Sequence, residues 1–165
     1  MRRTDREMSE KEAIELLKKA DYGFMGMVDE DGAPYVIPLN FVYADGAIYI
    51  HGAYEGQKMD NLTRDERACF SVVGGVEVIS ERFTTKYQSA LVRGRVKMLE
   101  DEPKRQALLL LCQKYTPVHM PQAVAEIEKS GSRTCVIRIS VDSITGKANR
   151  NAPPFPTLPV SSPTI

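Results

Sequence analysis

The feature that most constrains the fold is a strict alternation of residue types between Tyr87 and Leu99. Every second residue from Ala90 to Met98 is small or apolar, whereas Arg93, Arg95 and Lys97 occupy positions between them. Successive side chains of a strand point to opposite faces, so this segment predicts a β-strand with one face in a core and one in water. A chain built around such a strand needs further strands to pair with it.

Further segments have strand character, and turn sequences such as Asp-Glu-Asp-Gly and Ala-Asp-Gly separate several of them. They run from Tyr22 to Val28, Tyr35 to Tyr43, Ala47 to His51, Ala68 to Val73 and Thr134 to Val141. Because helices are inserted among these strands rather than alternating with them, we expect a mainly β fold with flanking helices. The pattern favours a six-stranded antiparallel β-barrel over a doubly wound sheet.

Helices are predicted where caps and apolar spacing coincide. Ser9 and Glu12 form a capping box before a helix that ends near Ala20. A short helix follows Lys58, a longer one begins at Asp101 and ends before Thr116, and another covers residues 121–129.

We expect one domain, residues 1–147, followed by a proline-rich extended tail, residues 148–165. Five of the ten prolines lie between Pro153 and Pro163, so this segment cannot continue a helix or a central strand. A disordered end and a segment docked along a partner subunit are both open readings.

The composition excludes several classes of protein. Hydrophobic residues make up 42% and charged residues 27% of the chain, and no apolar run is long enough for a membrane helix. The formal net charge is zero, so no global field attracts nucleic acid. The charged amino terminus lacks a secretory signal, so we expect a cytoplasmic protein without nucleic-acid or membrane partners. Cys69, Cys112 and Cys135 lie in apolar runs without the spacing of a zinc site, which indicates buried free thiols and no metal.

Motifs of nucleotide and serine hydrolases are missing, and the segment from His51 to Lys58 is the strongest local signal. A strand ends there in a loop with Gly52 and Gly56, and a helix then begins beside a lysine. Glycines let backbone N–H groups approach a phosphate, and a helix N-terminus and a lysine both favour an anion. The alternative is an ordinary strand-to-helix turn with a solvated lysine.

The order and spacing of several short segments resemble the pyridoxamine 5'-phosphate oxidase-like FMN-binding split barrels, and more narrowly their nitroimidazole-resistance branch. The likeness covers residues 2–147. It rests on Tyr35 to Phe41, His51 to Lys58 with Leu62, Cys69 to Val72, Tyr87-x-Ser89 before Gly94, residues 2–7 and residues 144–147.

The resemblance implies a cofactor site for FMN, with FAD as the alternative. Lys58 corresponds to the phosphate-binding lysine, with Gly52, Gly56 and Met59 beside it. His51 corresponds to a histidine next to the flavin, and the alternative is a strand-end histidine that is hydrogen-bonded to backbone. The resemblance further implies that the flavin ring is lined by Pro38, Leu39, Asn40, Ser71 and Val72. It implies that Tyr87 and Ser89 reach the ring from the partner subunit or from the opposite wall. Lys147 also matches a family position, but this match is a single residue, and a surface lysine explains it as well.

The implied function is an FMN-dependent oxidoreductase that reduces small planar acceptors such as nitroaromatics, with His51 as proton donor. The chain has no Trp and lacks the Arg-rich carboxy-terminal segment of true pyridoxamine 5'-phosphate oxidases, so vitamin B6 oxidation is not expected. The resemblance also implies a homodimer. A non-catalytic or haem-binding split-barrel module is the alternative function.

Overall fold

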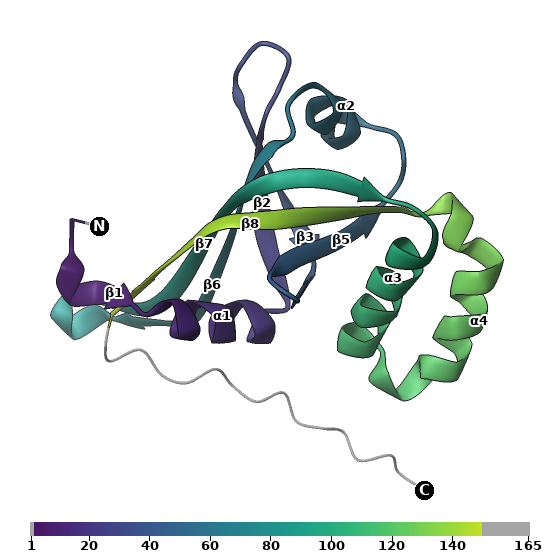
Figure 1. Cartoon of the computed structure of the whole chain (residues 1–165). Coiled ribbons are helices and arrows are strands. Elements are labelled where there is room, and N and C mark those ends of the chain that lie inside the picture. Colours follow the sequence, from purple (N-terminus) through teal and green to yellow (C-terminus); the bar gives the residue numbers. More distant parts are fainter. Residues whose placement is uncertain (1, 150–165) are drawn as a thin grey trace, which may run out of the picture.

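The protein is built around a single antiparallel sheet, seen here in a computed structural model that describes residues 2–149 (Figure 1). Eight strands pair in the order β3-β2-β6-β7-β8-β5-β4, and β1 pairs with β8. The strands are β1 (Glu7–Met8), β2 (Tyr22–Val28), β3 (Pro34–Asn40), β4 (Val42–Ala44), β5 (Ala47–Gly52), β6 (Arg67–Ile79), β7 (Thr84–Leu99) and β8 (Cys135–Ala148). The predicted mainly β class is confirmed.

The sheet curls because its two ends are neighbours in the chain. β3 and β4 lie at opposite ends of the strand order, yet only Phe41 separates them in sequence. The sheet must therefore bend until its ends meet at Phe41, which gives a split barrel. Phe41 is fully buried, and its ring centroid lies 4.7 Å from that of Phe70 in the core.

Four α-helices flank the sheet: α1 (Glu10–Lys19), α2 (Gln57–Arg64), α3 (Asp101–Tyr115) and α4 (Met120–Ser130). The predicted capping box opens α1, where the Ser9 side chain accepts a hydrogen bond from the Glu12 N–H. Helix α1 packs Ala13, Leu16 and Leu17 into the barrel core. Helices α3 and α4 form a hairpin beside one end of β7 and β8 (Figure 1).

Three strand boundaries differ from the sequence-based prediction. The expected strand from Tyr35 to Tyr43 is interrupted at Phe41, where the barrel closes. β6 does not stop at Gly74 but continues to Ile79 through a register shift between Gly74 and Glu77. β8 continues beyond Val141 to Ala148, so Ala148 belongs to a strand and not to the tail. The predicted proline-rich tail otherwise lies outside the described residues.

Candidate functional site

The predicted phosphate segment connects β5 to α2. Gly56 precedes the first turn of α2 with φ +104°, a conformation that residues with a Cβ rarely adopt, and it brings no side chain to cap the helix. The first helical N–H groups have no intrahelical acceptor, because helical bonds begin with Met59 and Asp60 donating to the Gly56 carbonyl. This end of α2 therefore offers N–H donors and a favourable dipole to an anion.

Lys58 lies over the end of β5. A Cβ atom at position 52 would lie only 2.4 Å from the Lys58 Nζ, so this position of the ammonium depends on glycine at 52. Lys58 is half-buried, and within residues 2–149 no carboxylate forms an ion pair with it. Its charge is therefore available to a ligand. Met59, in contrast, is buried in the core and contributes packing.

His51 lies on the outer face of β5. Desolvation and, second, the charge of Lys58 lower its pKa below the ordinary value of 6.5. His51 and Asn40 line a common cavity of about 350 Å³ together with residues of α3. The structure thus brings together two site residues that the sequence predicted from different strands. The α3 residues of this lining, which the sequence did not indicate, are Leu108, Leu111, Cys112 and Tyr115, with Thr116 after the helix.

The end of α3 fixes the β3–β4 junction. Lys114 Nζ donates hydrogen bonds to the carbonyls of Ala20 (2.6 Å) and Phe41 (2.8 Å) and lies 4.1 Å from the centroid of the Phe41 ring. The Tyr115 hydroxyl accepts a hydrogen bond from the Phe41 N–H (2.8 Å). Desolvation lowers the pKa of Lys114 to about 8, and desolvation also raises the pKa of Tyr115. These contacts hold Asn40 at the cavity.

A second group of predicted residues lies on the outer face of the sheet. Phe24 pairs with Pro38 on one side and with Ser71 on the other, so these three share a face. Pro38 is exposed and Ser71 is half-buried. Ser71 in turn pairs with Leu91 of β7. Leu91 pairs with Thr145 of β8, so this row crosses five strands.

The long strands β7 and β8 carry three further predicted residues, Tyr87, Ser89 and Lys147. Ser89 pairs with Lys147, and its hydroxyl donates to the Lys147 carbonyl at 3.3 Å. Tyr87 and Ser89 are two residues apart on β7 and therefore point to the same face. All three are half-buried.

Two predicted residues point into the core instead. Val72 has no exposed surface, and Leu39 is half-buried and packs against the same core cluster. Because successive side chains of a strand alternate, their neighbours Ser71 and Asn40 face outward. Any contact of Val72 with a ligand outside the barrel would involve its backbone.

The strand β8 pairs with residues of both groups, near its two ends. His51 pairs with Val136 near the beginning of β8, whereas Ser89 pairs with Lys147 near its end. These two positions of β8 are eleven residues apart, which at about 3.3 Å per residue is roughly 36 Å measured along β8.

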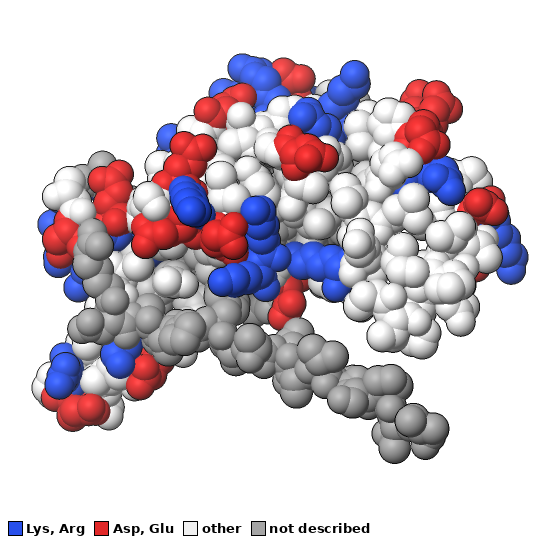
Figure 2. Space-filling model, turned by 60° about the horizontal axis from the view of Figure 1, so that its bottom comes forward, with Lys and Arg blue, Asp and Glu red and all other residues white. Residues whose placement is uncertain are grey.

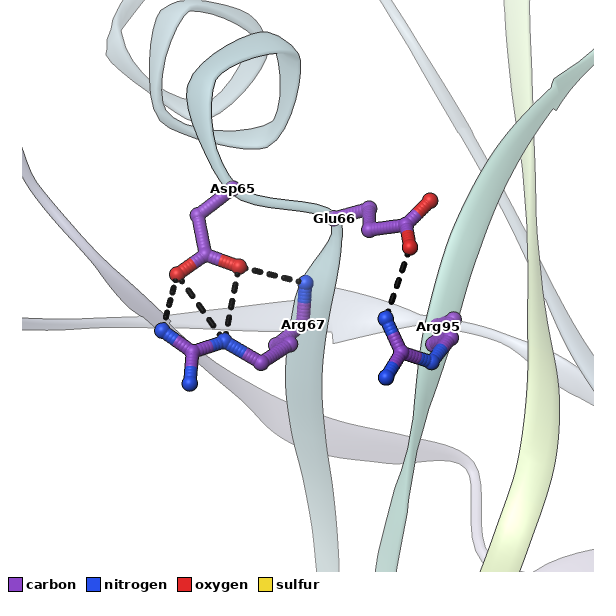
Figure 3. A network of polar contacts seen from close by, with 4 residues as sticks. All are labelled: Asp65, Glu66, Arg67 and Arg95. Atoms are coloured by element: carbon purple, nitrogen blue, oxygen red, sulfur yellow. Dashed lines mark hydrogen bonds and ion pairs between the residues drawn. The ribbon is translucent and has the colours of Figure 1, made fainter.

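Charge on the surface is mixed in sign. Figure 2 shows acidic and basic side chains interspersed over one face, without a broad area of a single sign. At the α2–β6 turn, Arg67 and Arg95 stand opposite each other on adjacent strands, and Asp65 and Glu66 offset their repulsion (Figure 3). The Arg67 guanidinium lowers the pKa of Asp65 to about 2. This network stabilises the turn and lies outside the candidate site.

Within the part of the chain that the structure describes, no group of three or more His, Cys, Asp or Glu side chains is arranged for a metal ion. The three cysteines are free, with Cys135 buried and Cys69 and Cys112 half-buried. None of the described helices combines the length and apolar character needed to cross a membrane.

Comparison with solved structures supports this fold. A candidate 5-nitroimidazole antibiotic resistance protein from Bacteroides thetaiotaomicron is 29% identical, with a TM-score of 0.72, over 86% of this chain and 85% of that chain. An FAD and haem binding protein from Mycobacterium smegmatis (23% identity, TM-score 0.77, 90% and 76% covered) and a flavocytochrome from Azotobacter vinelandii (20%, 0.73, 91% and 75%) share the fold.

No curated protein matches the sequence. A sequence model of the family described as pyridoxamine 5'-phosphate oxidase matches residues 9–148, nearly the whole described chain. The similarity to the Bacteroides protein agrees with the predicted nitroimidazole-resistance branch. The chain therefore belongs to the pyridoxamine 5'-phosphate oxidase family of flavin-binding split barrels.

Proposed function

We propose that this protein is a flavin-dependent oxidoreductase whose mononucleotide phosphate binds at Lys58. The observation that carries the proposal is the β5–α2 junction, where two glycines and an uncapped helix start converge with the Lys58 ammonium, which has no ion-pair partner among residues 2–149. These donors match the chemistry of a phosphate monoester. Pro38, Asn40 and His51 would contact the ring, with Ser71 beside them on the outer face. The function fits the cytoplasmic location expected from the sequence.

A bound flavin supplies two-electron transfer, so the protein has to hold the ring and admit an acceptor. His51 can hold a proton beside the flavin ring, at an imidazole nitrogen. The lowered pKa of His51 leaves its imidazole mainly uncharged at neutral pH. A phosphate at Lys58 offsets the ammonium charge that contributes to this shift, and thereby raises the proton affinity of His51.

The acceptor we propose is a small planar molecule, a nitroaromatic or a quinone. The cavity between β3, β5 and α3 is about 350 Å³ and has apolar walls from Leu108 and Leu111, with Asn40 and His51 as polar groups. Such a lining suits a flat, weakly polar molecule. The similarity to a protein linked with 5-nitroimidazole resistance supports the same class.

We propose a homodimer as the functional unit, because Ser89 and Lys147 pair near one end of β8, whereas His51 pairs near the other end. A second copy can place its Ser89 and Lys147 against the first copy's flavin. The outer sheet face also exposes large apolar side chains, with Tyr22 and Val36 each 59% and Phe24 41% exposed. Exposed apolar groups gathered on one face are typical of an interface.

The dimer is tested by light scattering together with flavin titration. We expect the wild type to be dimeric at micromolar concentration, and Phe24→Asp to give a folded monomer with weakened flavin binding. A wild-type monomer that binds flavin with full affinity would contradict the shared site.

A haem-binding module is the second candidate function, and the position of His51 favours it. The side chain is exposed at the edge of an apolar cavity, where an imidazole nitrogen can act as an axial ligand. One of the structures with this fold is described as binding both FAD and haem.

The absorbance spectrum of purified protein, followed by titration with FMN and haemin, separates the two functions. Flavin bands and FMN uptake support the oxidoreductase, and a Soret band with haemin uptake supports the module. A colourless protein that takes up neither ligand contradicts both.

A further inference from the structure

A second cavity lies on the outer face of the sheet, where the pairing between β2 and β6 ends. These two strands pair from Phe24 and Ser71 to Gly26 and Cys69. The cavity beside the last pair measures about 510 Å³, within the range of sites for small organic ligands. Its lining comes from β2, β3, β6, β7 and β8 and includes none of the residues predicted to bind the flavin.

Glycine at position 26 gives this cavity its depth. A Cβ atom there would lie 2.7 Å from the Cys69 Sγ, so a side chain at 26 and the thiol could not both occupy this space. Both residues line the cavity, and Cys69 is half-buried. The Cys69 thiol is therefore open to a ligand that enters.

The wall formed by β2 and β3 is apolar. Val36 stands opposite Gly26, and Pro34 stands opposite Val28. All four line the cavity, and the two valines are exposed on the outer face of the sheet instead of packing in the barrel core. This wall suits the apolar body of a ligand.

The wall formed by β6 and β7 is cationic. Arg67 and Arg95 stand opposite each other (Figure 3), and Arg93 lies two residues before Arg95 on the same face of β7. Asp65 and Glu66 bind Arg67 and Arg95, but within residues 2–149 no carboxylate forms an ion pair with Arg93. A free guanidinium can bind a carboxylate through two parallel hydrogen bonds.

The lining also contains the carboxylate of Asp142. The register of β7 and β8 shifts between Arg93 and Gly94, and Asp142 is the residue of β8 that this shift leaves unpaired. Its charge opposes the binding of an anion in the same cavity. Arg93 and Asp142 should therefore affect such binding in opposite directions.

We propose that this cavity binds an organic anion, a carboxylate on a flat apolar body. The carboxylate is bound by Arg93 on β7, and the apolar body lies over Gly26 against Val36. This site goes beyond the proposed function and does not depend on a flavin. Because Val36 also belongs to the exposed apolar face of the proposed dimer, the ligand lies at the edge of that interface.

The experiment is calorimetric titration of the full chain with 2-naphthoate and with its uncharged counterpart 2-naphthamide. We expect the naphthoate to bind at least about tenfold more tightly, the effect of one charge-assisted contact. Arg93→Ala should lower the naphthoate affinity about tenfold, whereas Asp142→Asn should raise it. Arg64→Ala is the matched control and should leave the affinity unchanged, because Arg64 is exposed, binds Glu30 and does not line the cavity.

Cysteine alkylation by iodoacetamide, read by mass spectrometry of the peptides, locates the ligand. Saturating naphthoate should slow the alkylation of Cys69 in this cavity and leave that of Cys112, in the cavity beside His51, unchanged.

The outcomes separate this inference from the proposed function. Equal affinities for the two probes, or wild-type affinity for naphthoate in Arg93→Ala, overturn the anion site. Protection of Cys112 instead of Cys69 also overturns it, because it assigns the ligand to the cavity beside His51. Each of these results leaves the flavin site at Lys58 standing, since FMN titration tests that site by itself.

Discussion

Replacing Lys58 with alanine removes the ammonium group that lies at the proposed phosphate. The ammonium is half-buried and has no carboxylate partner among residues 2–149, so its loss is not masked by a broken ion pair. A hydrogen bond to a charged group contributes about 1.5–3 kcal/mol. At about 1.4 kcal/mol for each factor of ten, the dissociation constant for FMN should rise roughly tenfold to a hundredfold.

Gly52→Ala tests the same contact without removing the lysine. The new Cβ would lie 2.4 Å from Lys58 Nζ, and the flexible lysine end would have to move away. Because only this side-chain end is displaced, the free energy of unfolding should change by less than about 1 kcal/mol. The affinity for FMN should nevertheless fall, since the ammonium no longer lies over the end of β5.

The assay is titration of flavin-free protein with FMN, with circular dichroism to verify that each variant is folded. Lys11→Ala, which removes the same charge from the exposed face of α1, is the control and should leave the dissociation constant unchanged. A folded Lys58→Ala protein with wild-type FMN affinity would refute the phosphate site.

Three further predictions concern protonation and packing. In an NMR titration, flavin binding should raise the pKa of His51 from its lowered value, because the phosphate offsets the charge of Lys58. An unchanged pKa would contradict the binding of the flavin phosphate beside Lys58 and His51. The pKa of Lys114 is lowered to about 8, so between about pH 8 and its ordinary value of 10.5 the unfolded chain binds more protons than the folded one. The free energy of unfolding should therefore rise with pH across this range, and denaturant titrations of Lys114→Met should lack that rise. Gly94→Val should cost about 1–3 kcal/mol or more in denaturant unfolding, because even a Cβ would lie 2.0 Å from a backbone carbonyl of β8. Gly131→Ala, which meets only ordinary contacts at 3.5 Å, should change stability by less than about 1 kcal/mol.

The sequence predicted the strands wherever alternation is uninterrupted, and it failed where the register shifts. Between Arg93 and Gly94 the pairing with β8 skips Asp142, and Asp142 and Ser143 are both exposed. Two consecutive polar residues interrupt the alternation of apolar and polar side chains, so the sequence predicted a strand that ends at Val141 and did not predict the second half of β8. The glycine pair beginning at Gly74 indicated the end of a strand, but it accompanies an irregularity within β6.

The phosphate segment was accessible to sequence analysis because its parts are local. Gly52, Gly56 and Lys58 lie within seven residues, and a strand end followed by a helix start determines how they face one another. The cavity residues of α3 follow from no such pattern. Leu108 and Leu111 appear in the sequence as the apolar stripe of an ordinary helix, and only the tertiary structure shows that part of this stripe lines a cavity beside His51.

The same helix also explains why Asn40 is at the cavity. If β3 continued into β4 without interruption, Asn40 would lie within one long strand and not at its end. Lys114 and Tyr115 bind the backbone of Phe41 and fix the break between the two strands there. The polar contacts of Lys114 and Tyr115 at one helix end thus fix both the closure of the barrel and the position of a site residue. Loss of the Tyr115 hydroxyl in Tyr115→Phe would leave the Phe41 N–H without this acceptor, at a cost of about 1–3 kcal/mol. Since Asn40 adjoins Phe41, the substitution should disturb the ligand site as well as the fold, and the two effects should appear together in flavin titration and denaturant unfolding.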